Sequence, residues 1–258
     1  MSFARNLLVS VSALCLLPLA AYAQAAPATP NYVTKDEVAG LVREALVKDP
    51  TILKDAITAL QKKDEEDQQA KLSESIKSNK DKLIANESLP AAGASIKDAD
   101  VTLVEFFDYH CGYCKQVLEP ITTLLKEDKK LRVVFVDFPI LSQDSAYAAR
   151  AAIALNRLDK SKYLDMHQEL MHFNGKFDEK AIKKVSEKIG VDFEKLKAEM
   201  GKTEVTNLVT QNRELGQSIG ITGTPAIIVG DVLLPGAVSI DEMRKVIAAT
   251  REANKTKK

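Results

Sequence analysis

The chain has 258 residues, of which 45% are hydrophobic and 28% charged, a composition typical of a globular protein with a core of its own. Basic and acidic side chains balance at 36 each, so overall charge provides no general attraction to nucleic acid or to anionic membranes. We therefore expect no nucleic-acid partner, and any activity must come from particular residues.

The first 23 residues have the pattern of a cleaved secretory signal peptide. A basic residue precedes an apolar run from 7 to 20, and residues 21–23 (Ala-Tyr-Ala) supply the small side chains that signal peptidase reads. The run is shorter than the roughly 20 residues that a membrane-spanning helix needs. A lipoprotein anchored at Cys15 is the alternative, but Leu14 stands where a small residue is required. We expect export to the periplasm, with outer-membrane or surface association as a second location.

Residues 24–90 are predicted to form a helical oligomerisation region and a linker. Thr34 and Glu37 match a capping box, a break at Asp49-Pro50 separates two helices, and the charged stretch 62–67 extends the second helix as an exposed stem. The apolar positions at helical spacing are Val38, Leu41, Val42, Ala45 and Leu46, then Leu53, Ala56, Ile57 and Leu60. The helices could pack on their own domain, but two helices this short enclose little core, which favours association with another chain.

Residues 91–258 are predicted to form one α/β domain, which follows a turn-rich boundary over residues 86–99. A β-rich run at 101–107 precedes helical spacing from 115 to 125 and a second buried strand at 131–136. A strand, a helix and a strand of these lengths suggest a parallel βαβ unit.

A block of helical periodicity from about residue 142 to 220 then interrupts the sheet. Its predicted helices cover residues 146–155, 163–171, 179–189, 193–200 and 204–219. Strand patterns return at 226–229 and 232–234, and a last helix begins near Ser239. The economical interpretation is one α/β domain with an inserted helical subdomain.

Cys111 and Cys114, the cysteines left after cleavage, lie where the strand at 101–107 meets the next helix. A ring this short restrains little chain entropy, so the pair is not a structural staple. At a helix N-terminus, free N–H groups and the helix dipole lower a thiol pKa. We therefore expect Cys111 to attack a substrate disulfide and Cys114, one turn later and more buried, to resolve the mixed disulfide.

A zinc site is the alternative interpretation of this cysteine pair. His110, or His167 together with His172, would complete the ligand set. Zinc sites usually contain matched pairs of close ligands, and the sequence has no second cysteine pair. We therefore expect neither a metal nor another cofactor.

Two further features support thiol chemistry. Glu105 lies in the otherwise apolar strand, six residues before Cys111. If it is buried, its raised pKa would let it carry the proton of the resolving thiol, whereas on a strand edge it would face solvent. Thr224-Pro225 precedes the strand at 226–229, where proline serves as an edge or turn device. A cis bond is the special case that the sequence by itself does not justify.

Residues 98–250 resemble the thioredoxin-fold, DsbA-like disulfide interchange proteins of bacterial envelopes. The resemblance rests on the cysteine pair, Glu105, Thr224-Pro225 and the helical insertion. The resemblance implies a thioredoxin fold in which the Thr224 backbone lies beside the dithiol and contacts substrate. The implied roles are nucleophile for Cys111, resolving thiol for Cys114, buried acid for Glu105 and cis-proline for Pro225.

The dipeptide Gly112-Tyr113 departs from the strongly oxidising members, which carry Pro-His there and use that histidine to stabilise the thiolate. Gly112-Tyr113 provides no such imidazole, although His110 is adjacent. Gly-Tyr, with Thr224 before the proline, resembles the DsbC and DsbG isomerases, and residues 38–60 resemble the oligomerisation segment of the ScsC proteins. The predicted substrate-binding residues are Thr224, Pro225, His110, Gly112 and Tyr113.

These features lead to three hypotheses. The first is an isomerase, a homodimer or homotrimer joined through residues 31 to about 85, which acts on unfolded or misoxidised exported proteins and is kept reduced by a DsbD-like membrane reductase. The second is a DsbA-type dithiol oxidase, reoxidised by a DsbB-like membrane partner. The third is a surface structural or adhesive protein, or a zinc-binding module, on a thioredoxin-like scaffold. The dipeptide and the N-terminal helices favour the first.

Overall fold

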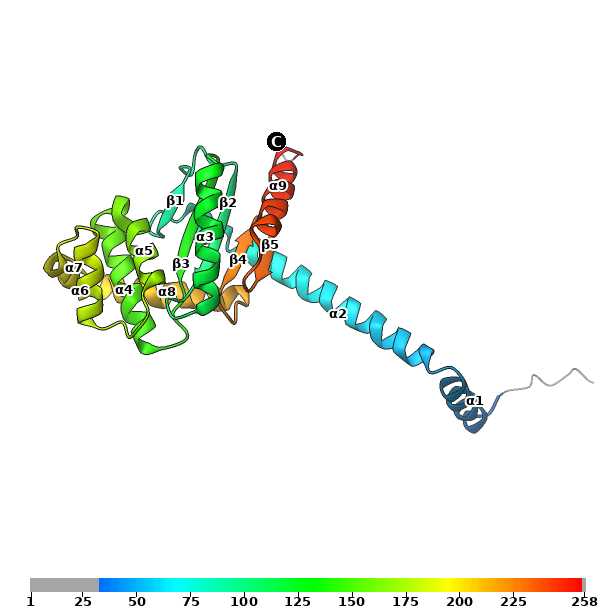
Figure 1. Cartoon of the computed structure of the whole chain (residues 1–258). Helices are drawn as coiled ribbons and strands as arrows, with labels where there is room; N and C mark the ends of the chain where they lie inside the picture. The colour runs from blue at the N-terminus through cyan, green and yellow to red at the C-terminus, as the bar shows by residue number, and fades with distance from the viewer. Residues whose placement is uncertain (1–32, 257–258) are drawn as a thin grey trace, which may run out of the picture. The chain divides into compact units, whose positions relative to one another are not determined.

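The computed structural model describes residues 33–256, which belong to two compact units (Figure 1). The first unit ends at Thr58 and the second begins at Ala59. The predicted signal peptide, residues 1–23, lies outside the described residues.

The first unit contains helix α1 (Lys35–Lys48) and the start of helix α2 (Thr51–Ser78). The predicted capping box is confirmed, because Thr34 Oγ1 accepts the Glu37 N–H and the Glu37 carboxylate accepts the Thr34 N–H. Asp49 ends α1, and its carboxylate accepts the N–H of Thr51 at 3.0 Å. Every residue of α1 is exposed, including its apolar ones.

Helix α2 is continuous over 28 residues and carries the predicted charged stem. Ion pairs one turn apart join Lys62 to Glu66 and Lys63 to Asp67, an arrangement that supports an exposed helix. Near its C-terminal end, Ile76 is buried in a core of the second unit together with Leu83. The chain therefore joins the packed core of the second unit before residue 90.

The second unit is built on a five-stranded sheet of order β1-β3-β2-β4-β5. The strands are β1 (Ala91–Gly93), β2 (Val101–Phe107), β3 (Leu131–Asp137), β4 (Ala226–Val229) and β5 (Val232–Pro235). The predicted parallel pairing of β2 with β3 is confirmed, and the other neighbours are antiparallel. β1 was not predicted, because alanine and glycine carry little strand propensity.

Helices cover both faces of this sheet. The remaining α-helices are α3 (Gly112–Glu127), α4 (Gln143–Leu158), α5 (Tyr163–His172), α6 (Glu179–Lys188), α7 (Phe193–Met200), α8 (Thr203–Ile219) and α9 (Ile240–Thr256). A short π-helix covers Asp81–Ala85 and a short 3₁₀-helix covers Lys160–Lys162. Figure 1 shows α3 beside β2 and β3, with α4 to α7 gathered at one side. The predicted helical insertion is therefore confirmed, and its helices differ from the predicted ones by a few residues at their ends.

Alternating strand residues divide the hydrophobic interior into two cores. Leu103 and Phe107 of β2 pack with α3, α4, α5 and α9, whereas Val104 and Phe106 pack with Ile76 and the end of α8. Both cysteines belong to the first of these cores. Within residues 33–256, no helix combines the length and the apolar character that a membrane span requires.

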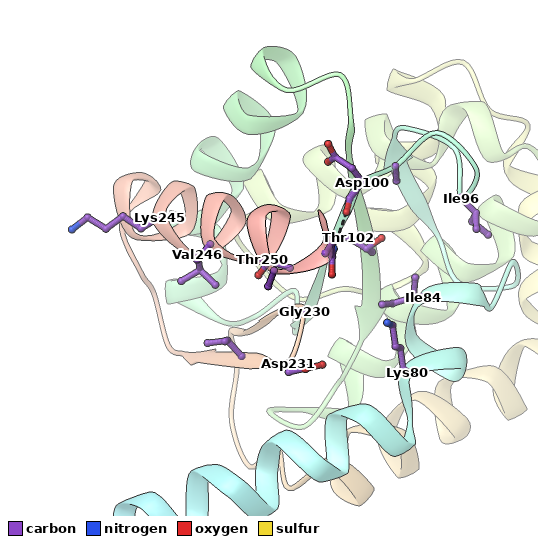
Figure 2. Close-up of a pocket in the computed structure, with 15 residues that line it drawn as sticks. Lys80, Ile84, Ile96, Asp100, Thr102, Gly230, Asp231, Lys245, Val246 and Thr250 are labelled. Carbon is purple, nitrogen blue, oxygen red and sulfur yellow. Dashed lines mark hydrogen bonds between the residues drawn. The ribbon is translucent and has the colours of Figure 1, made fainter. Parts of the chain in front are cut away.

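A cavity of about 630 Å³ opens between α9, the start of β2 and the turn from β4 to β5 (Figure 2). Thr102, Gly230 and Thr250 are among its lining residues. The lining includes neither cysteine nor Glu105, so this cavity is separate from the dithiol.

Candidate active site

Cys111 is the N-cap residue of α3, directly after the loop that leaves β2. Its Sγ accepts the backbone N–H of Cys114 at 3.1 Å, as a capping side chain does. Both cysteines are free thiols, and Cys114 has no exposed surface. The predicted strand-to-helix junction therefore places one sulfur at the helix terminus and the other one turn inside it.

The two thiols have opposite pKa shifts. A hydrogen bond from the Cys114 thiol lowers the pKa of Cys111 to about 6, and the Thr224 side chain and the N–H groups of Cys114 and Tyr113 act in the same direction, against burial. Burial, followed by the hydrogen bond to Cys111, raises the pKa of Cys114 well above its usual value. At neutral pH the pair is therefore a thiolate at Cys111 and a thiol at Cys114.

Glu105 lies at the centre of the sheet and is 1% exposed, so it does not face solvent at a strand edge. Its Oε1 has no hydrogen-bond partner among residues 33–256. Burial, followed by the negative charge of Cys111, raises the pKa of Glu105 to about 8. The protonation of this acid is therefore coupled to the charge on the dithiol.

Thr224 and Pro225 meet the dithiol because β4 runs antiparallel to β2. Phe106, near the end of β2, is opposite Ala226, the first residue of β4. The Thr224–Pro225 peptide bond is cis, and the thiol form of Cys111 donates a hydrogen bond to the Thr224 carbonyl at 3.3 Å. The resemblance to DsbA-like proteins implied that Thr224 lies beside the dithiol, and the pairing of β4 with β2 brings it there.

The other predicted substrate-binding residues have different surroundings. His110 Nε2 lies 2.7 Å from the Asp144 carboxylate in the first turn of α4, and this contact holds the pKa of Asp144 well below its usual range. Gly112 has open space where a side chain would begin, and Tyr113 is 64% exposed. The dithiol loop therefore presents a free surface at Gly112 and Tyr113, while His110 joins it to the helical insertion.

Asp108 is a residue of this site that sequence reasoning missed. Its buried carboxylate accepts three backbone N–H groups, from His110 at 2.8 Å and from Ile140 and Leu141 at 2.9 Å each. Its own backbone N–H bonds to the sulfur of Cys114. An acidic residue between a buried strand and a cysteine pair was the available signal, since Asp side chains commonly cap such turns.

His167 and His172, two of the three histidines considered as zinc ligands, have neighbours other than the cysteines. His167 is fully buried, with its ring centroid 4.8 Å from that of Phe107, and burial lowers its pKa to about 3. His172 is exposed, and its Nδ1 lies 2.8 Å from the Gln168 carbonyl. Across residues 33–256, no three or more His, Cys, Asp or Glu side chains are grouped to hold a metal ion.

Comparison with known proteins gives two family matches. Residues 102–248 match the DSBA-like thioredoxin domain, and residues 35–67 match the copper resistance protein ScsC N-terminal domain. The first match covers more than half of the chain and includes the dithiol and Pro225.

Individual relatives agree with these matches. A thioredoxin-like oxidoreductase from Silicibacter pomeroyi is 35% identical, with a TM-score of 0.63 over 67% of this chain and 98% of that chain. ScsC of Proteus mirabilis in a compact conformation is 31% identical, with a TM-score of 0.64 over 86% of this chain and 100% of that one. The probable disulfide bond formation protein D of Bacillus cereus is 29% identical over 162 residues, 58% of this chain and 74% of its own.

The two family matches together explain the thioredoxin-like sheet, its helical insertion and the helical N-terminal region. Proteins of the DSBA-like family exchange thiols and disulfides with substrate proteins and redox partners. The chain belongs to the DSBA-like thioredoxin domain family and is a thiol–disulfide oxidoreductase of the DsbA and ScsC type.

Proposed function

We propose that the chain is a periplasmic, oligomeric disulfide isomerase with additional oxidase activity. Cys111 is the nucleophile, Cys114 the resolving thiol and Glu105 the proton carrier. The observation that carries the isomerase assignment is the row of exposed apolar side chains on α1 and the start of α2, because several thiolates held around one misoxidised client favour reshuffling. The pKa of Cys111, about 6, supports its role as the attacking thiolate.

In the proposed reaction, the Cys111 thiolate attacks one sulfur of a substrate disulfide. A bond forms between Cys111 and that sulfur, the substrate bond breaks, and the other substrate sulfur leaves as a thiolate that takes a proton from water. Isomerisation follows when a second substrate thiolate attacks the mixed disulfide, which regenerates the Cys111 thiolate without net oxidation or reduction.

When the cysteines of the substrate stay incorrectly paired, a second reaction, in which Cys114 resolves the mixed disulfide, releases the substrate. Formation of the mixed disulfide removes the charge of Cys111, and with it the part of the Glu105 pKa increase that this charge causes. Glu105 then gives up its own proton to water more readily, and as a carboxylate it accepts the Cys114 proton, so that the Cys114 thiolate attacks the Cys111 sulfur. A Cys111–Cys114 disulfide forms and the substrate leaves as a dithiol, so the enzyme is oxidised and the substrate reduced. A membrane reductase of the DsbD class would restore the dithiol.

The proposed oligomer interface lies on the apolar side chains of α1 and early α2. Leu41 is 61% exposed and Leu53 is 55% exposed, although both repeat at helical spacing with other apolar residues. The exposed set comprises Val38, Leu41, Val42, Leu46, Val47, Ile52, Leu53, Ile57 and Leu60. Contiguous apolar surface of this kind usually marks an interaction site. We propose that copies of this chain cover it, as a dimer or trimer.

Analytical ultracentrifugation of the full-length mature chain tests this interface. We expect Leu41→Asp with Leu53→Asp to sediment as a single chain, while the wild type sediments as a dimer or trimer. Arg43→Asp with Lys54→Asp, on the polar side of the same helices, is the control and should keep the wild-type mass. A wild type that sediments as a monomer would exclude the interface. A truncation should start at Ala59, because one that starts at Ala91 removes the buried Ile76 and Leu83.

A DsbA-type dithiol oxidase is the second candidate function. The lowered pKa of Cys111 favours it, because a stabilised thiolate stabilises the reduced enzyme and makes its disulfide more oxidising. Trapping the thiols in intact cells separates the candidates: a dithiol at steady state supports the isomerase, and a disulfide supports an oxidase with a DsbB-like partner. The surface or adhesive alternative requires Cys111→Ser to leave the phenotype unchanged.

The proposed periplasmic location is tested by fractionation together with the mass of the mature protein. Cleavage after Ala23 would leave Gln24 as the first residue. An unprocessed chain in the cytoplasmic fraction would exclude periplasmic export, and a lipid-modified Cys15 would support the lipoprotein alternative.

A further inference from the structure

A second cavity, of about 360 Å³, lies between the loop before β1, the start of β3 and the end of α4. Arg132 of β3 lines it. Val134 and Val136 face the core opposite to that of the dithiol, and strand alternation places Arg132 on their side. Arg132 pairs with Thr102, five residues before the end of β2, so along the strand the cavity is roughly 17 Å from the start of the dithiol loop.

Arg132 is a mostly buried arginine that makes no ion pair within the described part of the chain. The residue is 9% exposed, and its Nε is buried without a hydrogen-bond partner. Among residues 33–256, no carboxylate lies within ion-pair distance of its guanidinium. Buried arginines are rare unless they are paired, because the lost hydration must be replaced. Burial lowers the pKa of Arg132, while the charge of Glu87 raises it.

Two more cations line the same cavity. Lys97 and Lys160 join Arg132 there, against the single carboxylate of Glu87, so the charged lining has a net excess of two positive charges. Lys160 Nζ donates to the Glu87 carbonyl at 3.2 Å, which fixes the loop next to the end of α4. Asn156 also lines the cavity and adds a polar group.

We propose that this cavity binds a small dianionic oxyanion of the phosphate type. The Arg132 guanidinium is its principal ligand, since its planar fork matches two oxygens of such an anion. Lys97 and Lys160 balance the remaining charge. The anion arrives as free phosphate or as the phosphate group of a small monoester. The site is separate from the dithiol and does not depend on which thiol–disulfide reaction the enzyme favours.

Calorimetric titration of the full-length mature protein with inorganic phosphate tests the site, at an ionic strength kept constant with chloride. We expect saturable binding to the wild type and about tenfold weaker binding, or none, to Arg132→Met, which keeps the apolar stem but removes the charge. Arg213→Met removes the same charge from an exposed position on α8 and should bind like the wild type. Glu87→Gln should bind more tightly, because one repelling charge is gone.

A parallel titration with glycerol phosphate distinguishes the two sources of the anion. If glycerol phosphate binds more tightly than inorganic phosphate, the ligand is a monoester. The proposal would be overturned if Arg132→Met and Arg213→Met lost phosphate affinity equally, or if the wild type bound no phosphate. Glu87 would then be the group that balances the charge of Arg132. If Arg132→Met does not fold, Lys97→Met with Lys160→Met replaces it, with the same expected loss. The thiolate absorbance of Cys111 should not change on titration, because the dithiol lies at the other end of β2.

Discussion

The carboxylate of Asp108 accepts the backbone N–H of Leu141 at 2.9 Å, which joins the loop that ends in Cys111 to the segment that leaves β3. The same carboxylate accepts the N–H groups of Ile140 and His110. One buried side chain thus holds together the two loops that extend from the parallel strands β2 and β3.

Replacing Asp108 should therefore destabilise the domain. We expect Asp108→Ala to lower the free energy of unfolding by about 2–3 kcal/mol, because three N–H groups lose a charged acceptor. Asp108→Asn should cost less, since its amide keeps one oxygen. Urea denaturation measures both, and the exposed Asp98→Ala should stay within about 0.5 kcal/mol of the wild type. An Asp108→Ala protein as stable as Asp98→Ala would contradict this account.

The reactivity of Cys111 should report its lowered pKa. We expect the rate of alkylation of the reduced protein to rise with pH and level off above a midpoint of about 6. Cys114→Ala should move the midpoint upward, because the hydrogen bond that contributes most to the lowered pKa is lost. A midpoint near 9.0, the ordinary value for a thiol, would exclude thiolate stabilisation by α3 and its neighbours.

The same pKa should make the stability of the reduced protein depend on pH. Between about 6 and 9.0 the unfolded thiol is protonated and the folded one is not, so stability rises with pH and is lost as pH falls through about 6. The disulfide form lacks this titration. Urea denaturation of both forms at several pH values should therefore show that the free energy of unfolding of the reduced form rises relative to that of the disulfide form as pH rises.

Glu105 should have the opposite effect on stability. Its folded pKa of about 8 lies above its ordinary 4.5, so the folded state keeps a proton that the unfolded state has lost, and stability falls as pH rises through this range. In the disulfide form Cys111 cannot titrate and its charge no longer raises the pKa of Glu105, but burial still does. Glu105→Gln should therefore be more stable than the wild type at neutral pH in that form, by at most about 3 kcal/mol. The exposed Glu119→Gln should leave the pH dependence unchanged. A Glu105→Gln protein with the wild-type slope would show that the buried acid does not titrate in this range.

Gly216 should not tolerate a methyl group. An added Cβ would lie 2.5 Å from Cε2 of Phe138, which packs edge-to-face with Phe106. We expect Gly216→Ala to destabilise the domain by about 1–3 kcal/mol, although alanine is the better helix former. Gly40→Ala, in α1 and with nothing within 4 Å of the new Cβ, should not destabilise the protein. Thermal unfolding monitored by circular dichroism compares the two.

Local patterns predicted most of the secondary structure. The capping box at Thr34, the buried strands β2 and β3 and the helical insertion follow from short-range spacing and propensity, and the structure contains them. β1 escaped prediction because Ala91-Ala92-Gly93 becomes a strand through its pairing with β3 and not through its own propensity. The helical spacing of the α1 apolar residues is likewise a local signal, whereas their exposure is a finding of the structure.

The amino-acid sequence by itself determined the reactive pair and its position at a strand-to-helix junction, because cap chemistry and hydrophobic periodicity act within a few residues. Only the tertiary structure decided what surrounds that pair. Glu105 is buried because helices cover the face of the sheet on which it lies. Thr224 reaches Cys111 across 113 residues because β4 pairs antiparallel with β2. Such contacts depend on how distant segments pack, and no short-range pattern encodes them.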